Sequence, residues 1–335
     1  MEVTEHALLE IRDTSSAGHA RRMAVDLAED IGFPEAEIGR LGIVVTEAAT
    51  NLVKHGGGGE LLLRTLGSNG TRGIGLLALD RGPGFANLAE AMRDGFSSAG
   101  TPGTGLGAIR RLSTMFDIYS IPGAGAALMA TVWPGTPPAQ APGLLASGIN
   151  VAYPGEQVSG DAWALRITPE RTVVFVSDGL GHGAIAAAAS EAAIGIFRER
   201  AGLRPPEILE YVHEGLRPTR GAAVAITEID RGQGVIRFAG IGNIAGTILL
   251  EGRTWSLVSH HGTAGHDVRR IQEFSYPWPS GATLVLHSDG LVSHWTLDHH
   301  PGLATRHPML VAGILYRDFC RGRDDTTVVV LREAS

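Results

Sequence analysis

Cysteine is almost absent from this sequence. Cys320 is the single one, so no disulfide can form within the chain and a reducing compartment is expected. Positive charge is also scarce, because 28 Lys and Arg stand against 35 Asp and Glu without a basic cluster, which argues against nucleic acid as a partner. No apolar run approaches the roughly 20 residues that cross a bilayer, and the first residues lack the features of a signal peptide. We therefore predict a cytoplasmic protein without a membrane segment.

The chain is long enough for two domains. With 335 residues, 44% of them hydrophobic, it can bury two separate cores. The clearest boundary is P-G-T-P-P-A-Q-A-P-G at 134–143, where prolines remove backbone donors and favour an extended course. We predict an N-terminal domain at 1–133, a Pro-rich linker at 134–147 and a C-terminal domain at 148–335.

The N-terminal part alternates between strand and helix patterns. A helix capped by Ser15 or Ser16 is indicated by apolar residues at helical spacing as far as Ile31. A second helix is predicted from Pro34 to His55, where four glycines stop it. The other expected elements are strands at 3–11, 60–66, 73–80, 116–121 and 126–133 and a helix near 105–115. Together they predict an α/β sandwich.

Strands dominate the C-terminal part. They are expected at 149–153, 161–167, 171–177, 221–228, 234–240, 244–250, 254–259, 282–288 and 326–332. Helices are expected after His182, after Pro205-Pro206 and at 308–319. Many strands with few, grouped helices favour two stacked sheets flanked by helices, an α-β-β-α sandwich.

Four aspartates stand at the edges of these apolar runs: Asp161 in V-S-G-D, Asp178 in V-S-D-G-L-G-H-G, Asp289 in H-S-D-G-L and Asp324 in R-D-D-T-T. Any one Asp-Gly pair is typical of a turn. If the strand ends converge, however, the four carboxylates repel one another unless cations neutralise them. Hard divalent ions such as Mg²⁺ or Mn²⁺ suit oxygen ligands, and Gly179 would let its own carbonyl approach one.

The order S-G-D, D-G-L-G-H-G, S-D-G, D-D-x-T resembles the metal-dependent serine/threonine phosphatases of the PPM superfamily, in their SpoIIE-type branch. L-R-P-T-R-G-A-A-V-A at 216–225 and F-A-G-I-G-N-I at 238–244 are similar to the RsbX-like subgroup. The resemblance covers nearly all of 148–332 and implies hydrolysis of serine or threonine phosphate with two Mn²⁺ or Mg²⁺ ions.

The resemblance also implies a role for each acid. Asp178 would bridge both ions and act in catalysis, while Asp161 would bind directly or through water. The Gly179 carbonyl would bind one ion, and the other would take Asp289 and Asp324, with Asp325 a weaker candidate than Asp324. One departure concerns the phosphate-binding arginine that many members have shortly before the first acid, because residues 149–160 contain none.

Three stretches of the N-terminal part could serve a nucleotide. In E-A-A-T-N-L-V-K-H at 47–55, Glu47 and Asn51 share one helical face, which could equally be a face turned to water. D-R-G-P-G at 80–84 follows an apolar run. P-G-T-G-L-G at 102–107 places three glycines at the start of a helix, where amides can approach phosphate.

These stretches resemble the N, G1 and G2 boxes of the GHKL (Bergerat) ATPase fold, and the short length is similar to anti-sigma-factor serine kinases of the RsbT/RsbW type. The resemblance implies that Asn51 holds Mg²⁺ beside ATP and that Glu47 is the base toward a protein serine. The remaining nucleotide contacts would come from Asp80 on the adenine amino group, Gly82 and Gly84 around the base, and Gly103, Gly105 and Gly107 around the phosphates. In this family Gly-Thr usually begins the last strand, where this chain has Gly125-Ala126.

The two resemblances together predict a bifunctional partner-switching regulator, with a protein serine kinase joined to a metal-dependent phosphatase. The implied partner is a phosphorylated STAS-type anti-sigma-factor antagonist, with a sigma factor or another switching component as a further partner, and a homodimer is compatible with this type. An alternative remains open, in which the N-terminal domain only binds ATP or a partner and regulates the phosphatase.

Overall fold

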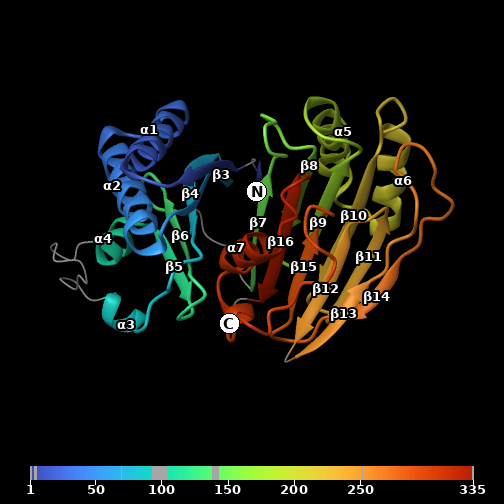
Figure 1. The fold of residues 1–335 in the computed structure, drawn as a ribbon. Coiled ribbons are helices and arrows are strands. Elements are labelled where there is room, and N and C mark those ends of the chain that lie inside the picture. Colours follow the sequence, from blue (N-terminus) through green and yellow to red (C-terminus); the bar gives the residue numbers. More distant parts are fainter. Residues whose placement is uncertain are drawn as a thin grey trace. The chain divides into compact units, whose positions relative to one another are not determined.

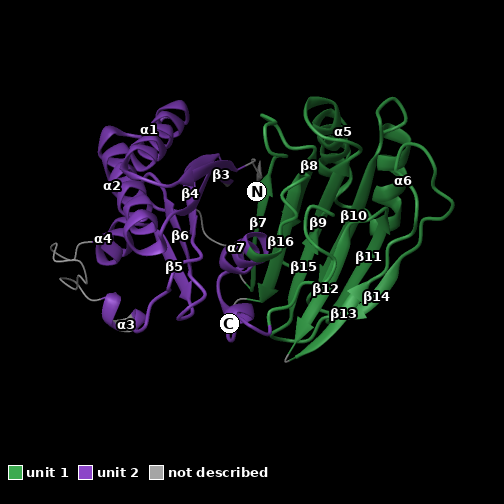
Figure 2. Ribbon diagram, viewed as in Figure 1, with its two compact units in different colours: residues 1–5, 140–297, 318–335 green, residues 6–139, 298–317 purple. Residues whose placement is uncertain are grey.

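The computed structural model describes residues 2–3, 6–68, 70–92, 105–137, 143–250 and 252–333. The chain forms two compact units (Figure 2). The N-terminal unit comprises residues 6–139 together with 298–317, and the C-terminal unit comprises residues 1–5, 140–297 and 318–335. The sequence-based division therefore differs from the structure at two places, because residues 298–317 group with the N-terminal unit and residues 1–5 with the C-terminal unit.

The N-terminal unit contains one sheet and several helices (Figure 1). Its elements are β2 (Ala7–Ile11), α1 (Thr14–Asp30), α2 (Glu35–Asn51), the π-helical turn η1 (Leu52–Gly56), β3 (Gly59–Ser68), β4 (Thr71–Leu79), α3 (Leu88–Ala91), α4 (Gly105–Leu112), β5 (Met115–Ser120), β6 (Ala126–Val132), η2 (Leu303–Thr305) and α7 (Pro308–Phe319). The sheet runs β2-β3-β4-β6-β5, with antiparallel neighbours throughout. Asp13 caps α1, and Ser16 completes the capping box, so the predicted cap at Ser15 or Ser16 was wrong.

Alternation along the strands gives this sheet two buried faces. Leu61 and Leu63 of β3 belong to the core on one face of the sheet. Helices α1, α2 and α4 cover that face (Figure 1). Leu77 and Leu79 of β4 point to the opposite face, against Gly313 of α7. Residues 308–317 are buried along their whole length. The helix at 308–319 thus belongs to the core of the N-terminal unit.

The C-terminal unit contains two five-stranded sheets. Its elements are β1 (Glu2–Val3), β7 (Leu144–Val151), β8 (Asp161–Ile167), β9 (Arg171–Gly179), α5 (Ala184–Arg200), α6 (Pro205–Gly215), β10 (Ala222–Asp230), β11 (Val235–Ile241), β12 (Ala245–Leu250), β13 (Arg253–Leu257), β14 (Phe274–Pro277), β15 (Thr283–His287) and β16 (Thr326–Glu333). The first sheet runs β14-β11-β10-β9-β8 and the second β13-β12-β15-β16-β7. Strand β7 begins at Leu144, inside the segment predicted as linker.

The sheets pack face to face over a core that decides where the acids point. Trp163 of β8 and Val176 of β9 lie in the core between the sheets, whereas Phe175 packs on the other side against α5 and α6. Because side chains alternate along a strand, Asp161 and Asp178 share the face of Trp163 and Val176. Both carboxylates therefore point into the space between the two sheets.

In the ranges that the structure describes, no helix combines the length and apolar character needed to cross a membrane.

Candidate functional site

Asp161 and Asp178 are direct cross-strand partners. Asp161 begins β8, Asp178 lies one residue before the end of β9, and the antiparallel register places them opposite each other. Side chains in such a pair have Cβ atoms about 5 Å apart, and two like charges there are destabilising. The fold thus brings two of the predicted metal ligands together at the cost of mutual repulsion.

Ser288 connects this pair to the second sheet. Its hydroxyl donates to Asp161 Oδ2 at 2.6 Å and accepts from the Thr327 backbone N–H at 3.0 Å. Ser288 directly follows β15, so the next residue, Asp289, lies at the same end of the sandwich. Asn243 Nδ2 donates to Asp289 Oδ2 at 2.8 Å and holds that carboxylate in place.

Asp324 and Asp325 precede β16 beside the S-D-G turn. A Cβ on Gly290 would lie 2.1 Å from the Asp325 backbone oxygen, which shows how closely the two loops pack. Asp325 Oδ1 accepts from the Tyr153 backbone N–H at 2.7 Å, and its side chain is buried, whereas Asp324 is half-buried. All four predicted acids therefore meet at one end of the sandwich, together with Asp325.

The carboxylates perturb one another strongly. Burial raises the pKa of Asp178 to about 9, and the charges of Asp161, Asp289 and Asp324 add to the rise. Burial also raises the pKa of Asp161 to about 8, with contributions from Asp325 and Asp289. The pKa of Asp289 is raised by burial and by Asp324. A site that holds protons near neutral pH in this way gains stability when cations take the place of the protons.

The donor set fits a hard divalent cation, because it consists of carboxylate oxygens around one end of the sandwich. As they lie, no three His, Cys, Asp or Glu side chains of the described residues are arranged to hold an ion together. Asp161 and Asp289 are instead hydrogen-bonded to Ser288 and Asn243.

Gly179 and His182 follow Asp178 in the same loop. A Cβ on Gly179 would lie 2.2 Å from the Ala186 backbone oxygen, so the first turn of α5 already requires a glycine here. His182 Nδ1 lies 2.7 Å from Glu156 Oε1, and its ring stacks on Tyr153 at 4.6 Å. These contacts fix the histidine beside the acids and give it a structural role.

Glu47 and Asn51 in the N-terminal unit face the start of α4. A Cβ on Gly105 would lie 3.4 Å from Asn51 Oδ1 and 3.7 Å from Glu47 Oε2. The Nδ2 of Asn51 is buried without a hydrogen-bond partner in the described part of the chain, so it can donate to a bound group. Gly107 lies in the same first turn. The predicted contact from Gly103 lies outside the described residues.

Asp80 lies where β4 ends and shapes the second half of this site. Its Oδ1 accepts from the backbone N–H groups of Gly82 at 2.8 Å and Ala126 at 3.2 Å. Burial raises the pKa of this carboxyl. Gly84 has φ +65°, and a Cβ there would lie 2.2 Å from the Ile121 backbone oxygen, so only glycine fits. Asp80, Gly82 and Gly84 therefore form one turn beside η1.

The π-helical turn η1 immediately follows Asn51. It includes Lys54 and His55, and the residue that caps it, Gly57, has φ +69°. A π turn in place of the predicted continuous α-helix to His55 shifts the residues after Asn51 around the helix axis, and such turns are frequent at functional sites. Gly56 packs on Asp80, since a Cβ there would lie 2.8 Å from Asp80 Cβ.

Comparison with known proteins covers both units. A model of the histidine kinase-like ATPase domain matches residues 12–131, and a model of stage II sporulation protein E (SpoIIE) matches residues 168–333. Serine/threonine-protein kinase RsbT of Bacillus subtilis (strain 168) is 31% identical over 114 residues, 34% of this chain and 86% of RsbT. The chain belongs to the RsbT-like family of histidine kinase-like ATPases and joins that domain to a SpoIIE-type phosphatase domain.

Two further relatives concern the phosphatase domain. Phosphoserine phosphatase RsbX of Bacillus subtilis (strain 168) is 22% identical over 138 residues, 41% of this chain and 69% of RsbX. A crystal structure of RsbX in complex with magnesium superposes with a TM-score of 0.52 at 17% identity, over 58% of this chain and 98% of that one. At this identity the likeness concerns the fold. The predicted GHKL-type and PPM-type architectures are confirmed.

Arg220 of the phosphatase domain was not singled out by the sequence analysis but lies near the proposed site. Its Nη1 lies 3.4 Å from the position that a Cβ on Gly181 would occupy, so the guanidinium lies beside the loop after Asp178. The side chain is exposed and has no hydrogen bond or ion pair with the described residues. Residues 149–160 contain no arginine, whereas Arg220 lies beside the acid-bearing loop and comes from the loop before β10.

Proposed function

We propose that the chain is a bifunctional partner-switching regulator. The phosphatase domain would hydrolyse a serine or threonine phosphate on a protein, and the ATPase domain would transfer phosphate from ATP to a protein serine. The relatives RsbT and RsbX, a kinase and a phosphoserine phosphatase by name, support pairing the two activities in one chain. The observation that carries the phosphatase half is the cluster of buried carboxylates around Asp178.

In the phosphatase domain, Asp178 and Asp161 would hold Mn²⁺ or Mg²⁺ together with Asp289, Asp324 and the Gly179 carbonyl. Two ions there would supply a water of lowered pKa and a clamp for the phosphoryl oxygens. Arg220 would orient the substrate phosphate, because a guanidinium forms paired hydrogen bonds with phosphate oxygens. Arg220→Lys keeps the charge but loses this fork, so it should raise KM more than it lowers kcat.

Phosphate release from a phosphoserine-bearing STAS-domain protein tests this half of the proposal. The wild-type chain should release phosphate with Mn²⁺ or Mg²⁺ and not with EDTA. Asp178→Asn should lower kcat by at least a hundredfold, since it removes the proposed bridging ligand. Glu191→Gln, which changes an exposed glutamate on α5 of the same unit, is the control. Equal turnover by Asp178→Asn and wild type would contradict the assignment.

In the ATPase domain, Glu47 would accept the serine proton while Asn51 holds Mg²⁺ on the ATP phosphates. The first turn of α4 would contact those phosphates through Gly103, Gly105 and Gly107, and Asp80 would accept from the adenine amino group. Positioning and charge neutralisation carry most of phosphoryl transfer, so this small set suffices. Glu47→Ala should abolish transfer to the partner while ATP still binds.

A second function is favoured by a specific contact. Arg317 of α7 donates to the Asp80 backbone oxygen at 2.7 Å. Helix α7 follows β15 of the phosphatase domain in the chain, and Asp80 lies at the end of β4 in the proposed nucleotide site. This favours a regulatory ATPase domain whose nucleotide state controls the phosphatase without phosphate transfer. In that case Glu47→Ala has no effect on the partner's phosphorylation, whereas ATP still changes the phosphatase rate.

The proposed partner is a STAS-type anti-sigma-factor antagonist, and a sigma factor or another switching protein is a further candidate. The resemblance of the N-terminal motifs to anti-sigma-factor kinases of the RsbT/RsbW type implies this choice. A cytoplasmic location and a homodimer through the ATPase domain complete the proposal. Copurification of the chain with a STAS-domain protein, strengthened by Asp178→Asn, would support the partner; equal capture of an unrelated phosphoprotein would contradict it.

A further inference from the structure

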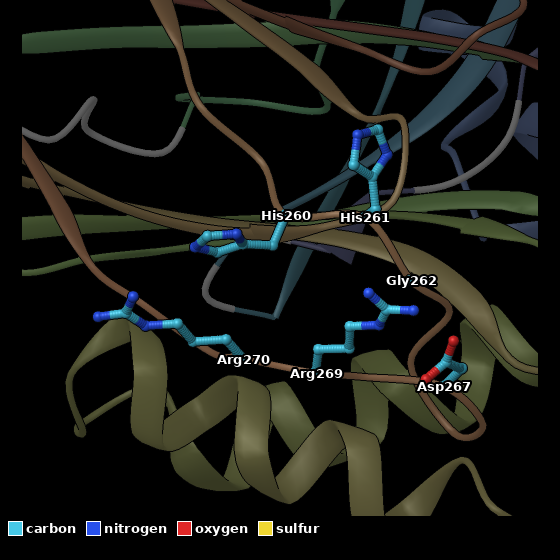
Figure 3. A pocket seen from close by; sticks show the side chains of 6 residues that line it. All are labelled: His260, His261, Gly262, Asp267, Arg269 and Arg270. Carbon is cyan, nitrogen blue, oxygen red and sulfur yellow. The ribbon is translucent and has the colours of Figure 1, made fainter.

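A cationic pocket lies in the phosphatase domain outside the carboxylate cluster. It has a volume of about 370 Å³ and is lined by His260, His261, Gly262, Asp267, Arg269 and Arg270. Figure 3 shows the Arg269 guanidinium turned toward Gly262 and Asp267, with Arg270 extending the other way, on the side of the His260 ring. The lining of the pocket therefore includes two guanidinium groups, two imidazoles and one carboxylate.

The loop that forms the pocket is fixed by its backbone. Gly262 pairs with Val268, and the Thr263 N–H donates to the Asp267 backbone oxygen at 2.9 Å. Gly262 has φ +143°, and a Cβ there would lie 2.3 Å from that same oxygen, so the tight turn requires glycine. The pocket is therefore built on a defined hairpin, which presents the two arginines directly after it.

Two anchors place this hairpin at the acid-bearing end of the first sheet. Ala264 and Ala222 exchange two backbone hydrogen bonds, and Ala222 is in turn the partner of Gly179. Two strand spacings, about 10 Å, hence separate Ala264 from the loop after Asp178. The second anchor is the bond from the Gly242 N–H to the His260 backbone oxygen, next to Asn243, which binds Asp289.

In the part of the chain that the structure describes, the arginines of the pocket form no interaction that stabilises the fold. Arg269 and Arg270 are exposed, and neither has a hydrogen bond or ion pair with another residue that the structure describes. His260 Nε2 is buried and likewise has no partner there. The whole chain carries a net charge of −7, yet this pocket presents two adjacent arginines. Such an arrangement favours an anionic ligand.

We propose that this pocket binds an acidic side chain of the protein substrate, near the phosphoserine that enters the carboxylate cluster. This inference rests on the proposed phosphatase function and adds its substrate class: phosphoproteins with Asp or Glu close to the phosphorylated residue. Arg269 and Arg270 provide the planar donors that match a carboxylate, and Asp267 repels it and limits the affinity. The pocket thereby contributes to selection of the substrate and takes no part in the chemistry.

The test uses the full chain and two fluorescein-labelled phosphoserine peptides, one with glutamates on both sides of the phosphoserine and one with glutamines. Affinities are measured by fluorescence anisotropy. Arg269→Gln/Arg270→Gln should lower the affinity for the acidic peptide about tenfold, since two exposed ion pairs are lost, and should leave the affinity for the neutral peptide unchanged. Asp267→Asn should raise the affinity for the acidic peptide about twofold. Arg198→Gln/Arg253→Gln, which removes the same charge from exposed sites on α5 and β13, should change neither affinity.

Equal weakening of both peptides by Arg269→Gln/Arg270→Gln, or no preference of the wild type for the acidic peptide, would overturn the proposal. Phosphate release from the neutral peptide by the wild type is measured in parallel. If release fails while the charge-dependent affinities hold, the proposed phosphatase function is wrong and the pocket assignment stands. If release occurs but the affinities do not depend on charge, the pocket assignment is wrong and the proposed phosphatase function stands.

Discussion

Arg317 Nη1 donates a 2.7 Å hydrogen bond to the backbone oxygen of Asp80. The arginine is buried at the end of α7, and Asp80 accepts from Gly82 and Ala126 on its carboxylate side. Asp80 thus supports the proposed nucleotide site through its carboxylate, and it contacts the segment 298–317 through its backbone oxygen. Arg317 is followed within a few residues by Asp324, a proposed metal ligand, so the chain itself links the two sites.

We expect Arg317→Ala to affect both stability and nucleotide binding. Loss of a hydrogen bond from a charged donor to a buried carbonyl should lower the free energy of unfolding by about 2 kcal/mol. Because the Asp80 turn loses support, the affinity for ATP should fall severalfold, and ATP should no longer change the phosphatase rate. Chemical denaturation and calorimetry measure these quantities, with exposed Arg72→Ala as control. If ATP still changes the phosphatase rate of Arg317→Ala, the contact between Arg317 and Asp80 does not couple the two domains.

The packing of α7 on β4 gives a second prediction. A Cβ on Gly313 would lie 2.9 Å from Leu77 Cδ2 and 3.1 Å from Leu79 Cδ2, both in a buried layer. Gly313→Leu should therefore lower the free energy of unfolding by about 1–3 kcal/mol through overpacking. Gly195→Leu is the matched control, because nothing lies within 4 Å of a Cβ at this exposed helical glycine. Similar thermal unfolding of both variants would contradict the docking of α7.

The carboxylate cluster predicts how the metal-free protein responds to pH. Folding raises the pKa values of Asp178 and Asp161 to about 9 and about 8, above their ordinary value near 3.8. Between about pH 4 and pH 9 the folded state therefore binds more protons than the unfolded state, so stability falls as pH rises, by about 1 kcal/mol per pH unit for each proton. Asp178→Asn should flatten this slope above pH 6, and saturating Mn²⁺ should reverse it. A metal-free stability that rises from pH 6 to pH 9 would contradict the cluster.

Gly105 tests the ATP site without disturbing the fold. A Cβ there would meet Asn51 Oδ1 at 3.4 Å and Glu47 Oε2 at 3.7 Å, which are ordinary contacts, so Gly105→Ala should fold normally. The methyl group would fill the space between the polar groups and the α4 backbone, and ATP affinity should fall at least tenfold. Gly39→Ala in α2, with nothing within 4 Å, should raise stability by about 0.5–1 kcal/mol and leave ATP binding intact. Unchanged ATP affinity in Gly105→Ala would place the nucleotide elsewhere.

Most helices and strands could be predicted because hydrophobic periodicity dictates them. The exceptions have physical reasons. Strand β14 (Phe274–Pro277) is too short to show a period, and β7 begins in a Pro-rich stretch whose composition is typical of a linker. The membership of 298–317 in the N-terminal unit depends on burial of Leu77 and Leu79 far earlier in the chain, which no local pattern reveals.

The candidate sites were predictable to a similar extent. Alternation along β8 and β9 already places Asp161 and Asp178 on the face of Trp163 and Val176, so their meeting follows from strand periodicity. Arg220 could not be found in this way, because its position beside Gly181 depends on the tertiary contact between two loops. The isolated G-x-G pattern at Gly105 likewise acquires meaning only when Asn51 is seen to face it.

Calorimetric titration of the metal-free chain with Mn²⁺ tests the central claim most directly, that separate aspartates of the phosphatase domain form one metal site. The wild type should bind two ions with the release of protons, since Asp161 and Asp178 are protonated near neutral pH without metal. Asp178→Asn should bind at least tenfold more weakly and release fewer protons, while Asp267→Asn behaves as the wild type. Mn²⁺ binding that is unchanged in Asp178→Asn, or absent from the wild type, would contradict the account.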